Sequence, residues 1–263
     1  MVDDMSRRGF DPLTYRFEDQ VPKPGDLTEV ADGVFWTRLP MMGRLNHINV
    51  WLLRDYDGWT VVDTGIFAED VQKHWQAVFD NHLAGGAVKR VIATHLHTDH
   101  TGNAGWITRK WDCELWMSRS DFYMCKVMAA DGPSDVPADA IRFYRRAGFT
   151  EERLDRYRER FGQFGANISP LPAGYNRIND GQYLDIGGRE WRAVIGQGHT
   201  PEHVCLYCPE LKLIIAGDQI LPKITPNVSV QPSEARANPL RDWITSCARF
   251  RELLPPNLLV LPA

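Results

Sequence analysis

The sequence lacks several features that would point to a membrane or secreted protein. No stretch approaches the roughly 18 uninterrupted apolar residues of a spanning helix, and no apolar segment follows the charges of the first eight residues, as a secretory signal would require. Cysteine is scarce: five residues among 263, without regular spacing, fit a reducing compartment better than a disulfide scaffold. Cys205 and Cys208 have the CxxC spacing but lie in an alternating, strand-like run, so we expect a structural role. These absences predict a cytoplasmic protein with no membrane partner.

The sequence also lacks a strong excess of charge of either sign. A net charge of −4 gives no global attraction to nucleic acid or to an anionic membrane, although a local basic groove stays open. With 43% hydrophobic residues, a chain of 263 residues can bury the core of one large α/β domain. We therefore expect a small-molecule substrate rather than nucleic acid, and the sequence leaves a homodimer open.

Hydrophobic periodicity and turn residues predict the order of the elements. The expected strands are 30–39 with a turn inside it, 47–53, 59–62, 88–93, 114–117, 182–186, 190–195, 204–208, 211–216 and 258–261, and the expected helices are 68–83, 103–111, 122–130, 138–147, 151–164 and 239–254. Strands that alternate with helices in two halves predict a pseudo-duplicated two-sheet α/β sandwich.

Two segments differ from the rest of the chain in composition. Residues 1–28 are polar and contain three prolines, so we expect an N-terminal arm before a domain that spans 29–263. Residues 118–172 combine helical apolar spacing with many arginines, and we expect a helical insertion within the domain. Its arginines either form a solvated face or belong to a lid that covers the site and contacts substrate.

The segment from His95 to His100 contains three histidines and an aspartate, directly after the apolar run 91–93. Alternate side chains of an extended backbone point the same way, so His95 and His97 can converge on one ion. Asp99 and His100 follow where the chain turns, and they can point toward a second ion. Neutral imidazole and carboxylate are ligands that Zn²⁺ prefers. The segment therefore predicts a metal site.

Three further candidates, Asp63, His199 and Asp218, also follow apolar strands, so all of them can meet along one edge of a sandwich. Four motifs carry a resemblance to the metallo-β-lactamase-fold superfamily: Val62-Asp63-Thr64-Gly65, the run His95 to His100, Gly198-His199-Thr200-Pro201 and Ala216-Gly217-Asp218. The resemblance covers about residues 30–261 and implies a four-layer αββα sandwich.

The resemblance also implies a role for each motif residue. His95, His97 and His199 would bind a first metal ion, Asp99 and His100 a second, Asp218 would bridge both, and Asp63 would support a histidine ligand without binding metal. The family's last histidine ligand follows its final strand, whereas no histidine follows His203 in this sequence, which ends at Ala263. We expect a shortened chain rather than an incomplete second site.

Two metal ions about 3.5–4 Å apart can share a hydroxide and lower its pKa toward neutrality. The hydroxide would attack a carbonyl carbon or a phosphorus atom while the ions stabilise the oxyanion. Asp99 could orient the hydroxide and carry a proton to the leaving group, so it is the candidate catalytic residue. We expect two zinc ions per chain, with iron or manganese left open by the Irving–Williams order.

Residue identities narrow the activity within the superfamily. His97 stands where the diiron flavoprotein oxidoreductases carry Glu, and Asp218 is the bridge that true β-lactamases lack. The ligand set is similar to that of hydroxyacylglutathione hydrolases, lactonases and related thioesterases, although Glu202 stands where that group usually has Gly. We therefore expect a hydrolase of a small ester, thioester or lactone, with a phosphodiesterase or nuclease as the alternative and a non-catalytic binding module as the third hypothesis. The sequence does not identify the substrate-binding residues.

Overall fold

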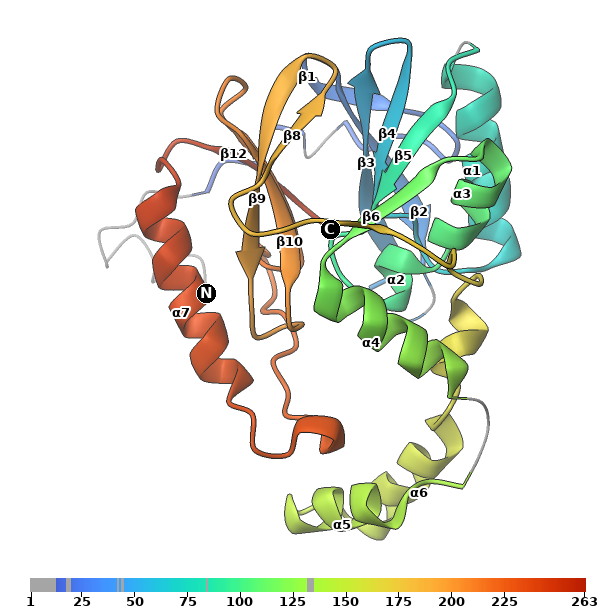
Figure 1. Ribbon diagram of the computed structural model, residues 1–263, viewed down its shortest axis with the longest axis vertical. Helices are drawn as coiled ribbons and strands as arrows, with labels where there is room; N and C mark the ends of the chain where they lie inside the picture. Colours follow the sequence, from blue (N-terminus) through green and yellow to red (C-terminus); the bar gives the residue numbers. More distant parts are fainter. Residues whose placement is uncertain (1–12, 18–19, 42, 44, 84, 132–134) are drawn as a thin grey trace.

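The computed structural model describes residues 13–17, 20–41, 43, 45–83, 85–131 and 135–263. Within them, two β-sheets pack face to face and helices cover both outer faces, as Figure 1 shows. The predicted four-layer αββα sandwich is therefore confirmed. No helix among the described residues is both long and apolar enough to cross a membrane.

The first sheet has seven strands that lie in sequence order. They are β1 (Thr28–Ala31), β2 (Val34–Pro40), β3 (His47–Asp55), β4 (Gly58–Val62), β5 (Val88–Ile92), β6 (Glu114–Met117) and β7 (Asn176–Arg177). The pairs β1–β2, β2–β3 and β3–β4 are antiparallel, whereas the pairs β4–β5, β5–β6 and β6–β7 are parallel. Because parallel strands end at the same edge of a sheet, the residues after β4 and after β5 meet at one edge.

The second sheet has five strands in the order β12-β11-β10-β9-β8. They are β8 (Tyr183–Ile186), β9 (Arg189–Gly196), β10 (His203–Cys208), β11 (Leu213–Gly217) and β12 (Leu259–Pro262). Strand β10 pairs antiparallel with both β9 and β11, so β9 and β11 point the same way. The loops that follow β9 and β11 therefore leave the sheet at one edge.

The helices divide between the two outer faces of the sandwich (Figure 1). They are α1 (Glu69–His82), α2 (Thr98–Thr101), α3 (Ala104–Trp111), α4 (Arg119–Ala130), α5 (Ala138–Arg146), α6 (Glu151–Arg160) and α7 (Pro239–Leu253). Trp75, Ile107 and Phe122 pack α1, α3 and α4 onto the first sheet. Phe250 of α7 packs on the second sheet. A third apolar cluster, which includes Trp191, lies between the sheets.

Only part of the segment 118–172 stands away from the sandwich. Phe122 and Cys125 of α4 are buried in the core of the first sheet, at 2% and 0% exposure, so α4 belongs to the domain itself. Helices α5 and α6 lie beyond α4 at one end of the molecule (Figure 1). The Tyr144 hydroxyl on α5 donates to Gln231 Oε1 at 3.4 Å, so this helix pair reaches the loop that follows Asp218.

Residues 1–12 and 18–19 of the expected N-terminal arm lie outside the described residues. In the described part, Leu27 packs against the core of the first sheet and Phe17 against the apolar cluster between the sheets. Among the strands and α-helices of the described residues, β7 with two residues and α2 with four were not predicted, because both are too short to show hydrophobic periodicity.

Candidate metal centre

Asp63 directly follows β4 and adopts a left-handed backbone conformation with φ of 63°, which Asp tolerates better than most residues. This turn directs its carboxylate at the next strand end. Asp63 Oδ1 accepts the Thr94 N–H at 2.8 Å, and Oδ2 accepts the Thr94 hydroxyl at 2.9 Å and His100 Nδ1–H at 2.8 Å. Asp63 thus supports His100 from behind, the position that the resemblance implies.

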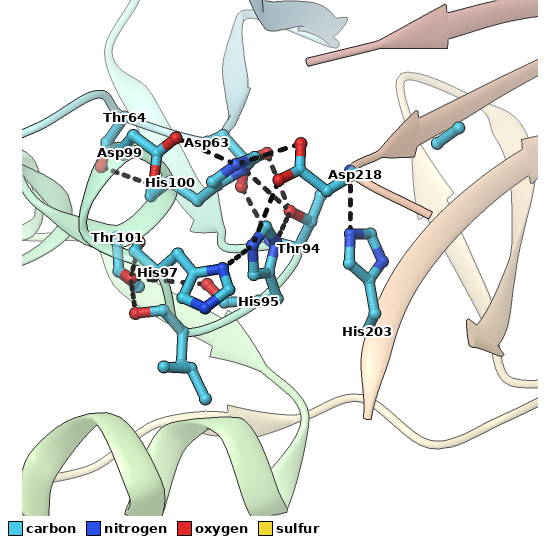
Figure 2. A network of polar contacts seen from close by, with 12 residues as sticks. Asp63, Thr64, Thr94, His95, His97, Asp99, His100, Thr101, His203 and Asp218 are labelled. Atoms are coloured by element: carbon cyan, nitrogen blue, oxygen red, sulfur yellow. Dashed lines mark hydrogen bonds and ion pairs between the residues drawn. The ribbon is translucent and has the colours of Figure 1, made fainter. Parts of the chain in front are cut away.

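The loop after β5 carries His95 and His97 to the edge of the sheet (Figure 2). His95 is fully buried, and its Nδ1 lies 3.1 Å from Thr94 Oγ1. Its Nε2 lies 2.9 Å from His97 Nδ1. The Thr101 hydroxyl contacts the carbonyl oxygens of Leu96 and His97 at 2.8 Å each, which holds the loop against α2. The two ring nitrogens therefore converge on one point.

His199 reaches the same point from the second sheet, on the loop after β9. Its Nδ1–H donates to the carbonyl oxygen of Asn227 at 2.8 Å, which fixes the tautomer and leaves Nε2 free for a metal. That Nε2 lies 3.2 Å from His95 Nε2 and 3.2 Å from Asp218 Oδ2. The sequence does not reveal the Asn227 contact, because a backbone carbonyl carries no residue-specific signal.

His203 lies behind the centre and supports the loop of Asp218. Its ring is fully buried and stacks on His95 with centroids 4.6 Å apart. Its Nε2 accepts the Asp218 N–H at 3.1 Å, as Figure 2 shows. His203 therefore positions Asp218 and has its Nε2 occupied by this hydrogen bond.

A first set of ligand atoms fits a zinc ion. His95, His97, His199 and Asp218 each offer one atom, and the four atoms lie within 4.8 Å of one another. Tetrahedral zinc with Zn–N bonds of 2.0–2.1 Å places its nitrogens about 3.3 Å apart. The nitrogen separations of 2.9 and 3.2 Å are close to this value.

A second set lies beside the first. His100 Nε2 is buried without a hydrogen-bond partner, which is costly unless a cation binds there. It lies 3.5 Å from Asp218 Oδ1 and 3.7 Å from Asp99 Oδ2. Asp218 thus presents Oδ1 to this set and Oδ2 to the first set. The arrangement fits the bridging role, with Asp99 and His100 as the remaining donors of the second set.

Burial sets the protonation state of the first two histidines. Burial and the neighbouring imidazoles lower the pKa of His95 far below its ordinary value. The same causes lower the pKa of His97 to about 3. Both side chains are therefore neutral at pH 7, which is the form that binds metal without releasing a proton.

The neighbouring carboxylates raise the pKa of His100. Burial alone would lower its pKa, but Asp63, Asp218 and Asp99 outweigh burial and raise it well above the ordinary value. Burial would raise the pKa of Asp218, but the neighbouring His100 outweighs this effect, and the pKa of Asp218 is lowered. Burial raises the pKa of Asp99. The direction of the His100 shift reflects the negative charge that Asp63, Asp218 and Asp99 place around its ring.

Sequence reasoning missed one buried carboxylate next to the centre. Asp121 on α4 is fully buried, and burial raises its pKa to about 6. Its Oδ1 accepts the Leu96 N–H at 3.0 Å and its Oδ2 accepts the Glu202 N–H at 2.8 Å. The pattern Ser118-x-x-Asp121 is visible in the sequence, but it predicts a helix cap and not a contact with the histidine loops.

Comparison with known proteins identifies the family of this chain. The family model described as "Metallo-beta-lactamase superfamily" matches residues 43–263. The chain belongs to the metallo-β-lactamase superfamily. It is a hydrolase of this superfamily, and a histidine-aspartate cluster is present among its described residues.

Several superfamily members are similar over most of their length. The crystal structure of a beta-lactamase domain protein from Burkholderia ambifaria is 38% identical, with 95% of this chain and 74% of that chain covered and a TM-score of 0.83. A metallo-beta-lactamase family protein from Thermus thermophilus has a TM-score of 0.70 at 24% identity, with 86% and 71% covered. Acyl-coenzyme A thioesterase MBLAC2 of Gallus gallus is 23% identical over 239 residues, 89% of this chain and 78% of that protein.

Proposed function

We propose that this superfamily hydrolase cleaves small carboxyl esters, thioesters or lactones with two divalent metal ions, zinc in the first instance. The observation that carries the proposal is the position of Asp218 between two donor sets. Its Oδ2 lies 3.2 Å from His199 Nε2, and its Oδ1 lies 3.5 Å from His100 Nε2. A carboxylate shared in this way suits a pair of ions better than a single ion.

The bound ions would polarise the acyl carbonyl and lower the pKa of a water molecule. The side chains would bind the ions and transfer the proton. His95 and His97 hold their ring nitrogens in neutral form toward the first set, and His199 directs Nε2 at the same set. Asp99 is partly exposed, with its side chain at 24%, and burial raises its pKa, so its other oxygen, Oδ1, can take a proton and pass it to the leaving group.

A cysteine nucleophile is a poor alternative. Cys125 and Cys205 are fully buried. Burial raises the pKa of Cys125 to about 12 and that of Cys205 well above its ordinary value, so neither forms a thiolate at pH 7. Water is therefore the expected nucleophile, and no acyl-enzyme on these thiols is required.

A thioester substrate has support from the name of one relative. The relative from Gallus gallus is named an acyl-coenzyme A thioesterase and covers 89% of this chain. The nuclease alternative needs free basic residues, and three arginines of the helix pair α5–α6 form ion pairs with acids of the same segment. These pairs are Arg145–Glu151, Arg156–Glu152 and Arg158–Asp155. The pairing favours the solvated face over a nucleic-acid groove.

We also propose a cytoplasmic location. All five cysteines are free, and Cys205 and Cys208 are both buried in β10 without a disulfide between them. Free, buried thiols are stable in a reducing compartment.

The experiment is elemental analysis of metal content, followed by turnover of a panel of thioesters, lactones and phosphodiesters. We expect close to two zinc ions per chain and turnover of an acyl substrate. His97→Ala should remove the activity but leave the far-ultraviolet circular dichroism spectrum unchanged, whereas His82→Ala, on the outer helix α1, should retain both. Turnover of phosphodiesters alone, or the absence of bound metal, would contradict the proposal.

A further inference from the structure

One buried carboxylate outside the ligand sets contacts both histidine loops. Asp121 Oδ1 accepts the N–H of Leu96, which lies between His95 and His97, at 3.0 Å. Asp121 Oδ2 accepts the N–H of Glu202, three residues after His199, at 2.8 Å. A single side chain therefore links a loop of the first sheet to a loop of the second sheet.

Glu202 returns the contact to the same helix. Its Oε2 accepts the N–H of Ser120 at 2.7 Å, in the first turn of α4. The first N–H groups of a helix need acceptors from outside it, and the N-cap residue Ser118 makes no side-chain capping bond. Two reciprocal hydrogen bonds, one accepted by Asp121 and one by Glu202, therefore join α4 to the loop of His199.

A role in helix capping alone does not account for these contacts. In a capping box, the acidic side chain at the third helical position bonds back to the N–H of its own N-cap residue. Asp121 instead directs both oxygens at backbone N–H groups of other loops, at 0% exposure. Within the cap it contacts the Ser118 hydroxyl, at the longer distance of 3.3 Å.

We propose that Asp121 is a positioning residue for the metal centre, held by Glu202, and that it sets the separation between the His95–His97 loop and the His199 loop. The inference rests on the proposed metal-dependent function. If the two loops shift relative to each other, their nitrogens leave the spacing that suits one ion. Outer groups that orient metal ligands typically change metal affinity 10- to 100-fold when they are removed.

Asp55 provides a matched control at the other end of β3 and β4. It is also fully buried, and it also joins the two sheets: it accepts the Thr60 hydroxyl at 2.7 Å and the Gly187 N–H at 3.1 Å. Its Oδ2 also pairs with Arg90 at 2.8 Å. A change at Asp55 should therefore lower stability without moving the histidine loops.

The experiment is competition for zinc between the full-length protein and a chromophoric chelator, with the thermal midpoint of the zinc-free protein measured in parallel. Asp121→Asn keeps the side-chain shape but turns one acceptor into an NH₂ group that faces an N–H. We expect zinc affinity to fall at least 10-fold. Asp55→Asn should lower the midpoint and leave affinity within about twofold of the unsubstituted protein.

Substitutions of Glu202 give a second test, because Glu202 is less buried than Asp121 and its replacement leaves no altered polar group in the core. Glu202→Gln keeps an acceptor for Ser120 and should retain the affinity, whereas Glu202→Ala should lower it. Unchanged affinity in both Asp121→Asn and Glu202→Ala would overturn the inference, as would an equal loss in Asp55→Asn. An unsubstituted protein that binds no zinc would refute the proposed function together with the inference. An unsubstituted protein that binds zinc, with unchanged affinity in these variants, would refute the inference alone.

Discussion

Asp63 illustrates how one residue serves the backbone and the site at the same time. Its φ of 63° turns the chain after β4, and its carboxylate then meets Thr94 and His100. The Thr94 hydroxyl also lies 3.1 Å from His95 Nδ1, so Asp63 contacts one donor set directly and reaches the other through Thr94. A side chain at this position must be both tolerant of the left-handed conformation and able to accept hydrogen bonds.

We therefore predict that Asp63→Asn weakens metal binding without disturbing the turn. Asn tolerates positive φ as well as Asp does, but an uncharged amide holds His100 Nδ1–H less strongly than a carboxylate. The affinity for the second zinc ion should fall about 10- to 100-fold, as measured by zinc stoichiometry at limiting free zinc. A variant that retains both ions at the affinity of the unsubstituted protein would contradict this prediction.

Among the elements, α7 holds the loop of His199. Gly198 has φ of 106°, and a Cβ there would lie 2.4 Å from Trp243 Cβ and 2.5 Å from the carbonyl oxygen of Pro239. The Gln197 N–H also donates to the Ser246 hydroxyl at 2.9 Å. Only glycine permits this close approach between the loop and the helix.

We predict that Gly198→Ala lowers both the free energy of unfolding and the zinc affinity. The strained backbone and the displaced helix together should cost about 2 kcal/mol or more, measured by urea unfolding. Gly174→Ala is the control, since a Cβ there meets no atom within 4 Å. Equal effects of the two substitutions would show that α7 does not hold the loop.

Helix α1 anchors the described part of the N-terminal arm through a histidine that titrates. His74 is 8% exposed, and its Nε2 accepts the Gly25 N–H at 2.8 Å. Burial lowers the pKa of His74. The folded state therefore favours the neutral ring, and this contribution to stability is complete above the ordinary pKa of about 6.5 and is lost as the pH falls below it.

We predict that His74→Gln flattens the pH dependence of stability between pH 7 and pH 5. Gln keeps an acceptor for Gly25 but does not titrate. The measurement is the difference in unfolding free energy between the variant and the unsubstituted protein, since the buried histidines of the metal centre contribute equally to both. If the unfolding free energy of His74→Gln changed with pH as steeply as that of the unsubstituted protein, His74 would not make this contribution.

At the scale of the whole molecule, the candidate metal centre joins the two sheets. His95, His97, Asp99 and His100 follow β5 of the first sheet, whereas His199 and Asp218 follow β9 and β11 of the second. An ion bound by both groups of ligands binds the folded state and not the separated strands. Metal binding should therefore stabilise the sandwich as a whole.

We predict that chelation of the metal lowers the thermal midpoint. A ligand at about 1,000 times its Kd contributes about 4 kcal/mol, which corresponds to roughly 8–16 °C for a domain of this size. Differential scanning calorimetry with and without EDTA measures the shift. His97→Ala should show little response to EDTA, and an equal response of both proteins would mean that the metal acts elsewhere.

The sequence by itself determined the order of elements and the ligand candidates. Apolar periodicity and turn residues mark β3, β4, α1 and α7 because these signals are local. The spacing of His95, His97, Asp99 and His100 is equally local. All four residues follow the same strand, so the sequence alone predicts that they lie close together. The resemblance then placed Asp63, His199 and Asp218 by motif.

Only the tertiary structure decided how these loops are held. Asp121 and Leu96 are 25 residues apart, Asp121 and Glu202 are 81 apart, and His199 and Asn227 are 28 apart. Tertiary packing likewise decided that α4 contributes Phe122 and Cys125 to the core of the first sheet. A hydrogen bond to a backbone group depends on distance and direction and scarcely on the residue type of that group, so a local sequence pattern cannot specify it.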